Sequence, residues 1–208
     1  MITAVGTEIG TETRTDTDWA ALTLDAAGRC TAFLEDADGD WTRPAGRLEW
    51  SGHRTLDHLA LGLTGYAGLL TAKPRDRYIT LFASLDPEAP VSARLEGIRV
   101  AASFLAAAVR AAAPADRAWH PWGHADGPGF AAMGVVETVV HTHDIAAGLG
   151  LGWTPPDDLA APALGRLFPD APGGHTPGET LLWCTGRLAL PGLGLRGEWQ
   201  WDGSVRPV

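Results

Sequence analysis

The amino-acid sequence predicts an all-α protein built as a four-helix bundle. Two observations carry the prediction. Four long stretches repeat apolar residues at intervals of three and four, which is the spacing of one helix face. Each stretch is followed by turn-forming residues, glycine or proline, which end helices. Loops join the four stretches, so the helices can pack side by side around a shared apolar core.

The first two helices are predicted over residues 16–37 and 51–72. Asp16 or Thr17 is the expected cap of the first helix, and a turn-rich connection follows it. The second helix begins near Ser51 and ends before the Lys73-Pro74 pair. Residues 77–86, "RYITLFASLD", are predicted to be a strand or a continuing helix, because periodicity cannot decide over so short a run.

The third and fourth helices are predicted over residues 91–113 and 130–149. Pro114 stops the third helix, and Gly148 and Gly150 end the fourth. A shorter helix is expected at about 157–168. The remaining tail, about 175–208, is expected to be an extended element or an irregular hairpin packed on the bundle.

Length and composition fit one globular domain. The chain has 208 residues, of which 45% are hydrophobic and 20% are charged. We expect a disordered lead-in at residues 1–15, which are polar and rich in threonine, and a single domain over residues 16–208. The formal net charge of −9 argues against nucleic acid or an anionic membrane surface as a partner.

The chain is also expected to be cytoplasmic and free of membrane spans. No apolar run approaches the ~20 residues that cross a bilayer. The N-terminus lacks the basic and apolar regions of a signal peptide. Cys30 and Cys184 lie far apart and form no CxxC unit, so two buried thiols in a reducing compartment are expected.

The chemistry is expected on the fourth helix, in the stretch "GVVETVVHTHDIAAGLG". Glu137 and His141 are four residues apart and therefore lie on one helix face. Valines surround them on the rest of the helix. A carboxylate and an imidazole in such surroundings must be paired with each other, bound to a metal, or exposed at a cleft.

His58 on the second helix is the best candidate for a third member of this group. By itself it would be read as a satisfied core histidine. Together with Glu137 and His141 it completes a set of two imidazoles and one carboxylate, which suits a divalent metal with open positions, as in catalytic zinc or non-haem iron sites.

Three motifs in order resemble one known family. "WSGHRTLDHL" resembles the second-helix motif of the DinB-like superfamily, in its mycothiol-dependent maleylpyruvate isomerase branch. "ETVVHTHDIA" resembles the Glu-x-x-x-His-x-x-Asp signature of that branch, and "LLWCTGRLALPG" resembles the segment after the bundle in many actinobacterial members. The resemblance covers the chain from about Asp16 to Trp201.

The resemblance implies a DinB-like four-helix bundle whose metal ligands are His58, Glu137 and His141, with zinc as the usual metal. Members that isomerise maleylpyruvate carry a further C-terminal α/β domain, and this chain ends before such a domain. The resemblance therefore implies the bundle and the metal site more directly than the isomerase reaction.

Other polar residues near the two motifs have two interpretations each. Asp144 orients a neighbouring histidine as a hydrogen-bond acceptor, or it is a charge on the helix surface. His143 points about 200° around the helix from His141, so it is not expected to be a ligand. His120 and His124 line the mouth of the site or belong to a solvated aromatic loop, and the loop is the preferred expectation.

The tail and the tryptophans complete the candidate site. Arg187 is the candidate for binding an anionic substrate or a cofactor carboxylate, with a surface or tail-anchoring role as the alternative. Tryptophans at 119, 122 and 153 are predicted to wall a pocket beside the fourth helix, and those at 19, 50 and 183 to pack in the fold.

The function these features favour is a metal-dependent enzyme. It would use a low-molecular-weight thiol, mycothiol by the resemblance, for S-transfer to, or isomerisation of, an electrophilic small-molecule substrate. One alternative is a DinB-like metal-binding stress or ligand-binding protein without catalysis, acting as a homodimer or a ligand carrier. The other is non-haem iron oxidation, which the same ligand set permits.

Overall fold

The computed structural model describes residues 17–206, which form six helices and no β-strand. The helices are α1 (Trp19–Glu35), α2 (Gly52–Ala72), α3 (Val91–Ala111), α4 (Gly127–Gly148), α5 (Asp157–Leu167) and α6 (Pro177–Cys184). The predicted all-α class is therefore confirmed. The lead-in predicted for residues 1–15 lies outside the described residues.

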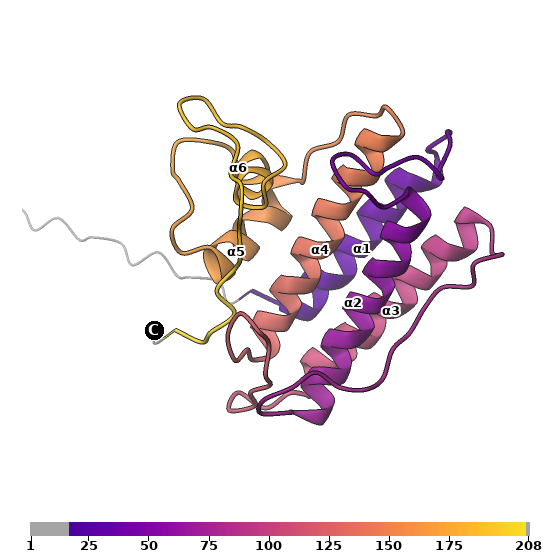
Figure 1. Cartoon of the computed structure of the whole chain (residues 1–208). Coiled ribbons are helices and arrows are strands. Elements are labelled where there is room, and N and C mark those ends of the chain that lie inside the picture. Colours follow the sequence, from indigo (N-terminus) through magenta and orange to yellow (C-terminus); the bar gives the residue numbers. More distant parts are fainter. Residues whose placement is uncertain (1–16, 207–208) are drawn as a thin grey trace, which may run out of the picture.

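Helices α1 to α4 lie side by side as the bundle, and α5, α6 and the tail lie beside α4, away from α2 and α3 (Figure 1). Because α4 contacts all three other long helices as well as α5, it is buried on nearly every side. A polar side chain on a buried face of this helix is removed from bulk water. It must find a partner or line a cavity. No described helix is long and apolar enough to cross a membrane.

Side-chain caps set where the first two helices begin. The predicted cap of α1, Asp16 or Thr17, was wrong: the Asp18 carboxylate accepts the Ala21 N–H at 2.9 Å, so the helix begins at Trp19. Several neighbouring residues could cap a helix here, and only the backbone geometry chooses between them. The start of α2 is as predicted, with Ser51 Oγ accepting the Arg54 N–H.

The start of α4 also differs from the prediction. The helix begins at Gly127 instead of residue 130, because the Asp126 carboxylate accepts the Gly129 N–H at 2.8 Å and Pro128 sits in the first turn. An Asp followed by proline is a recognisable helix start. The apolar pattern begins only at Phe130, which is why periodicity placed the start too late.

Residues 77–86 form neither of the two predicted elements, strand or helix, and run as an irregular segment along α2 and α3. The Asp57 carboxylate accepts the Leu85 N–H at 2.7 Å and fixes this path. Leu81 and Phe82 are largely exposed on it.

The tail is partly helical, which corrects the expectation of an extended element or hairpin. Thr176 caps α6: its Oγ1 accepts the Glu179 N–H and donates to the Glu179 carboxylate, and Pro177 sits in the first turn. After α6 the chain is irregular but anchored: Asp202 N–H donates to Leu167 O, and Gly203 N–H donates to Trp122 O.

Candidate metal centre

The packing of α2 against α4 brings His58, Glu137 and His141 together. One Glu137 carboxylate oxygen, Oε2, lies 3.0 Å from His141 Nε2 and 3.6 Å from His58 Nε2. Potential ligand atoms of all three residues lie within 4.8 Å of one another. The two imidazole rings meet edge to face with 5.2 Å between centroids. Two nitrogens and one oxygen thus converge as a divalent ion of the zinc or iron type requires.

The His141 ring is held in one orientation by a carboxylate on the side away from Glu137. Its Nδ1 lies 3.1 Å from Asp144 Oδ2, which leaves Nε2 facing Glu137. A carboxylate behind the ring is the usual partner of a metal-binding histidine, because it fixes the tautomer and the ring plane. The expectation that Asp144 is a surface charge is ruled out by its burial, since only 1% of the residue is exposed.

Arg187 completes this arrangement from the tail. Its Nε donates to Asp144 Oδ1 at 3.2 Å, and its Nη2 donates to Asp144 Oδ2 at 2.9 Å. Its Nη1 donates to Thr185 O, and the residue also lies in the wall of the cavity described below. The guanidinium therefore ties the tail to the back of the candidate centre.

The charges of the group depend on each other. Burial alone would raise the pKa of Glu137, but the imidazoles of His141 and His58 hold it well below its usual range. Burial alone would lower the pKa of His141, but Asp144 and Glu137 raise it to about 9. With no metal bound, a proton on His141 therefore balances the charge of Glu137, while Arg187 is paired with Asp144. A metal ion would take over that role and displace the proton.

Tyr66 is a member of the site that sequence reasoning missed. Its hydroxyl donates to Glu137 Oε1 across 3.3 Å, so the second carboxylate oxygen is also held. Burial and the charge of Glu137 raise the pKa of Tyr66 well above 10, so the phenol stays a neutral donor. The position of Tyr66 two turns after His58 was the available signal.

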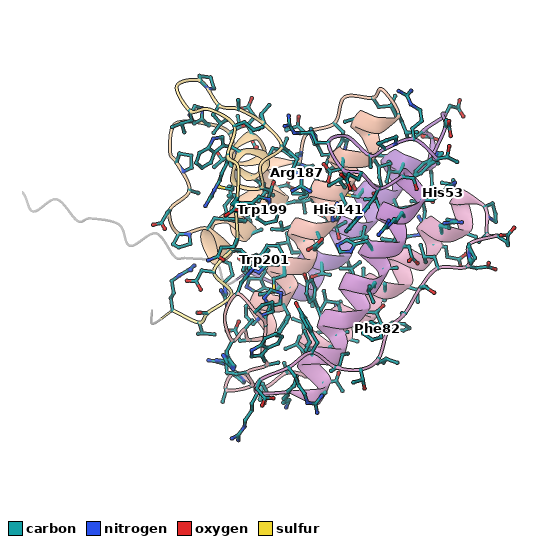
Figure 2. The ribbon with its side chains drawn as sticks, in the orientation of Figure 1. His53, Phe82, His141, Arg187, Trp199 and Trp201 are labelled. Carbon is teal, nitrogen blue, oxygen red and sulfur yellow. The ribbon has the colours of Figure 1, made fainter. Side chains whose placement is uncertain are left out.

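A cavity of about 500 Å³ opens in front of the three residues. Aromatic side chains from four irregular segments wall it: Trp50 between α1 and α2, Tyr78 between α2 and α3, Trp122 between α3 and α4, and Trp199 in the tail. His141, Arg187, Trp199 and Trp201 lie near one another at the junction of α4 and the tail (Figure 2). The bundle thus supplies the potential ligands, and the connections supply the walls.

The predicted pocket tryptophans are only partly right. Trp122 lines the cavity, whereas Trp119 packs on Tyr78 and Trp153 on Phe33, outside the wall. Trp50, expected to pack in the fold, instead stands over His58 with 4.8 Å between ring centroids. Which tryptophan reaches the cavity depends on how the loops fold back over the bundle.

Of the other histidines near the site, His120 lines the cavity, and His124 and His143 do not. His120 is buried and lines the cavity, so the expectation that it belongs to a solvated loop was wrong. Its Nδ1 accepts the Trp122 N–H, and burial lowers the pKa of His120 to about 4. His124 is exposed, and its Nε2 lies 2.8 Å from Arg75 O. His143 points away from the centre, with Nδ1 2.6 Å from Trp153 O, in line with its expected exclusion.

Comparison with known proteins places the chain in a family. Residues 23–146 match the family model described as the mycothiol maleylpyruvate isomerase N-terminal domain, well over half of the chain. The chain belongs to this family. It is the DinB-like branch that the motifs resemble. The comparisons with curated proteins and with solved structures returned no match.

The family match includes His58, Glu137 and His141 but ends before α5. Arg187, Trp199 and Trp201 therefore lie outside the matched region. These three residues of the cavity wall thus come from a part of the chain whose sequence the family model does not describe.

Proposed function

We propose that His58, Glu137 and His141 bind a divalent metal, with Zn²⁺ as the expected ion. On this metal the chain would act as an enzyme that uses a low-molecular-weight thiol of the mycothiol type for S-transfer to, or isomerisation of, an electrophilic small molecule. The observation that carries the proposal is the convergence of two imidazoles and a carboxylate at the wall of a cavity. Three protein ligands with room for a fourth are the pattern of catalytic zinc.

A zinc ion held in this way lowers the pKa of a bound thiol, so that the thiol is present as thiolate near neutral pH. The chain's own residues prepare the site for it. Asp144 and Arg187 hold the His141 ring, and Tyr66 holds the far oxygen of Glu137. Aromatic side chains line the same space.

An external thiol is needed because neither cysteine is a suitable nucleophile. Cys30 and Cys184 are free and buried. Burial raises the pKa of Cys30 to about 12 and also raises the pKa of Cys184, so both stay protonated near neutral pH. Neither lines the cavity. The thiolate must therefore come from a cofactor.

Arg187 is the proposed contact for an anionic group of the thiol cofactor. Asp144 takes its Nε and one Nη2 position, and Thr185 O takes one hydrogen of Nη1. A guanidinium carries five N–H donors, so two remain for a ligand. The paired carboxylate keeps the side chain in place at the cavity wall.

Metal content is the first test. The chain, purified without added metal, is expected to contain one zinc per molecule by elemental mass spectrometry. His58→Ala is expected to abolish the metal and leave the bundle folded by circular dichroism, while His143→Ala, on the opposite face of α4, keeps it. Absence of any stoichiometric metal contradicts the proposal, and iron in place of zinc favours the oxidation alternative.

Turnover is the second test. Thiols incubated with electrophiles are screened by mass spectrometry for S-conjugates and isomers. Activity should disappear on chelation and return with Zn²⁺. Turnover that survives complete chelation excludes a metal-bound thiolate, and stoichiometric metal without turnover across the screen favours a binding protein.

A further inference from the structure

His120 is held in one tautomer by its own loop. The backbone N–H of Trp122 donates to His120 Nδ1 at 3.2 Å. A backbone N–H can only donate, so Nδ1 accepts and carries no proton. Burial disfavours the charged form of the ring and lowers the pKa of His120 to about 4. Near neutral pH the ring is therefore uncharged, and its proton lies on Nε2.

The Nε2–H group of His120 is open to the cavity. Within residues 17–206, His120 Nε2 has no hydrogen-bond partner. The fully buried side-chain nitrogens that lack a partner in this range belong to His53 and Trp201, so His120 Nε2 is not enclosed by the fold. The open space that His120 borders is the cavity in front of the candidate metal centre. Its N–H is therefore a free donor for a bound ligand.

This donor is close to the candidate metal centre and fixed in place. The ring centroids of His120 and Tyr66 are 6.2 Å apart, and the Tyr66 hydroxyl donates to Glu137 Oε1. All three residues line the same cavity. Four further rings pack around His120: Tyr78, Trp122, Phe130 and Trp201. A donor held in this way stabilises charge on a ligand oxygen without first having to reorient.

We propose that His120 is a catalytic residue whose Nε2–H donates to an oxygen of the bound electrophile, the oxygen on which negative charge develops when the thiolate attacks. The inference rests on the proposed function for the thiolate. The donor itself depends only on the position and tautomer of His120. A ketone conjugated with a carbon–carbon double bond is the simplest electrophile that has such an oxygen.

The addition of a thiolate to a conjugated ketone shows what the donor does. The sulfur electron pair forms a bond to the β-carbon, the carbon–carbon π pair moves next to the carbonyl carbon, and the carbonyl π pair moves onto oxygen. His120 donates a hydrogen bond to this oxygen and keeps its proton. The α-carbon then takes a proton from solvent, which replaces the one that the thiol released when it became a thiolate. Loss of one donor of this type lowers kcat by about 100- to 1,000-fold.

Two substitutions separate the donor from the rest of the ring. In His120→Gln, the side-chain amide nitrogen can take the place of Nε2, so the donor is kept. In His120→Asn, the shorter amide can accept the Trp122 N–H as Nδ1 does, but it does not extend to the position of Nε2. Both variants should hold as much metal as the parent protein, because His120 is not one of the three potential ligands. His124→Asn is the matched control, since His124 lies on the same loop but outside the cavity wall.

Polarisation of a bound carbonyl group is measured first, by infrared spectroscopy with benzylideneacetone, a conjugated ketone. Metal is removed by chelation beforehand, because a bound metal would itself polarise the carbonyl. A hydrogen bond to the oxygen weakens the carbon–oxygen double bond and lowers its stretching frequency. The bound ketone should show this shift in the parent, His120→Gln and His124→Asn proteins, and lose it in His120→Asn. No shift in the parent, or an equal shift in His120→Asn, overturns the inference.

Turnover is measured with zinc-loaded protein, mycothiol and benzylideneacetone, by the loss of the absorbance of the conjugated ketone. His120→Asn should lower kcat by about 100- to 1,000-fold, His120→Gln should recover most of this loss, and His124→Asn should leave kcat unchanged. The two proposals fail in different ways. Turnover that needs zinc but is as fast in His120→Asn as in the parent overturns this inference alone. Turnover that survives complete chelation and still depends on His120 overturns the metal-bound thiolate and leaves the donor standing.

Discussion

Replacement of Asp144 by asparagine tests how the candidate centre is held together. The Asp144 carboxylate accepts three hydrogen bonds: one from His141 Nδ1, at 3.1 Å, and two from Arg187, at 3.2 and 2.9 Å. Oδ2 serves His141 and Arg187 together. Asparagine keeps the shape, but its NH₂ group must face at least one of these donors.

The size of the effect follows from the burial of the pair. Only 1% of the Asp144 side chain and 12% of the Arg187 side chain are exposed, so solvent cannot replace the lost charge. Losing one hydrogen bond between charged groups costs about 1.5–3 kcal/mol, and removing one partner of a buried ion pair costs up to about 3–5 kcal/mol. Because one or two hydrogen bonds survive in Asp144→Asn, we expect a loss of about 2–3 kcal/mol in the free energy of unfolding. Metal affinity should fall about 10- to 100-fold, as for other changes behind a metal-binding histidine.

The assays are urea denaturation of metal-free protein and zinc titration against a competing chelator. Asp158→Asn is the matched control, because Arg29 also binds Asp158 through two hydrogen bonds, but both side chains are well exposed. It should lower stability by no more than about 1 kcal/mol and leave zinc affinity unchanged. Asp144→Asn protein that is folded and binds zinc as tightly as the parent would refute the reasoning that Asp144 orients His141.

Three further predictions concern pH and packing. The pKa of His120 is lowered from about 6.5 in the unfolded chain to about 4 in the fold, so the unfolded state binds more protons between these values. Unfolding free energy should fall as pH drops from 6.5 to 4, by up to about 3 kcal/mol, and His120→Gln should remove this part of the urea-measured pH dependence. An equal dependence in the variant would contradict a neutral, buried His120. The second prediction concerns His141, whose pKa is raised to about 9 in the metal-free protein. Because zinc must displace the His141 proton, zinc affinity should rise about tenfold per pH unit between roughly pH 6 and 8. A chelator titration in which zinc affinity does not change with pH would disprove this. Gly148→Ala should lower the free energy of unfolding by about 1–3 kcal/mol, because the new methyl group would collide with the Pro44 carbonyl oxygen. Gly165→Ala, whose Cβ would have nothing within 4 Å, should raise the free energy of unfolding by about 0.5–1 kcal/mol. The same melting temperature for both variants would contradict the close approach.

Local patterns in the sequence were sufficient for the helices and for part of the site. Helix spacing alone places Glu137 and His141 on one face, since residues four apart always share a face. The start of α4 was misplaced and α6 was not predicted at all, although their signals, Asp126 before Gly-Pro and Thr176 before Glu179, are also local. Apolar periodicity does not extend into a helix's first turn, so it is a poor guide to where a helix begins.

The sequence by itself thus determined the four long helices, the pairing of Glu137 with His141, and the choice of His58 as their partner through its motif. Only the tertiary structure decided that Arg187 faces Asp144 across 43 residues of chain, and that four loops turn Trp50, Tyr78, Trp122 and Trp199 toward one cavity. Helix periodicity depends only on residues that are close together in the sequence, so a short stretch is enough to detect it. The path of an irregular segment depends on which surfaces the packed helices leave for it, and no short stretch of sequence contains that information.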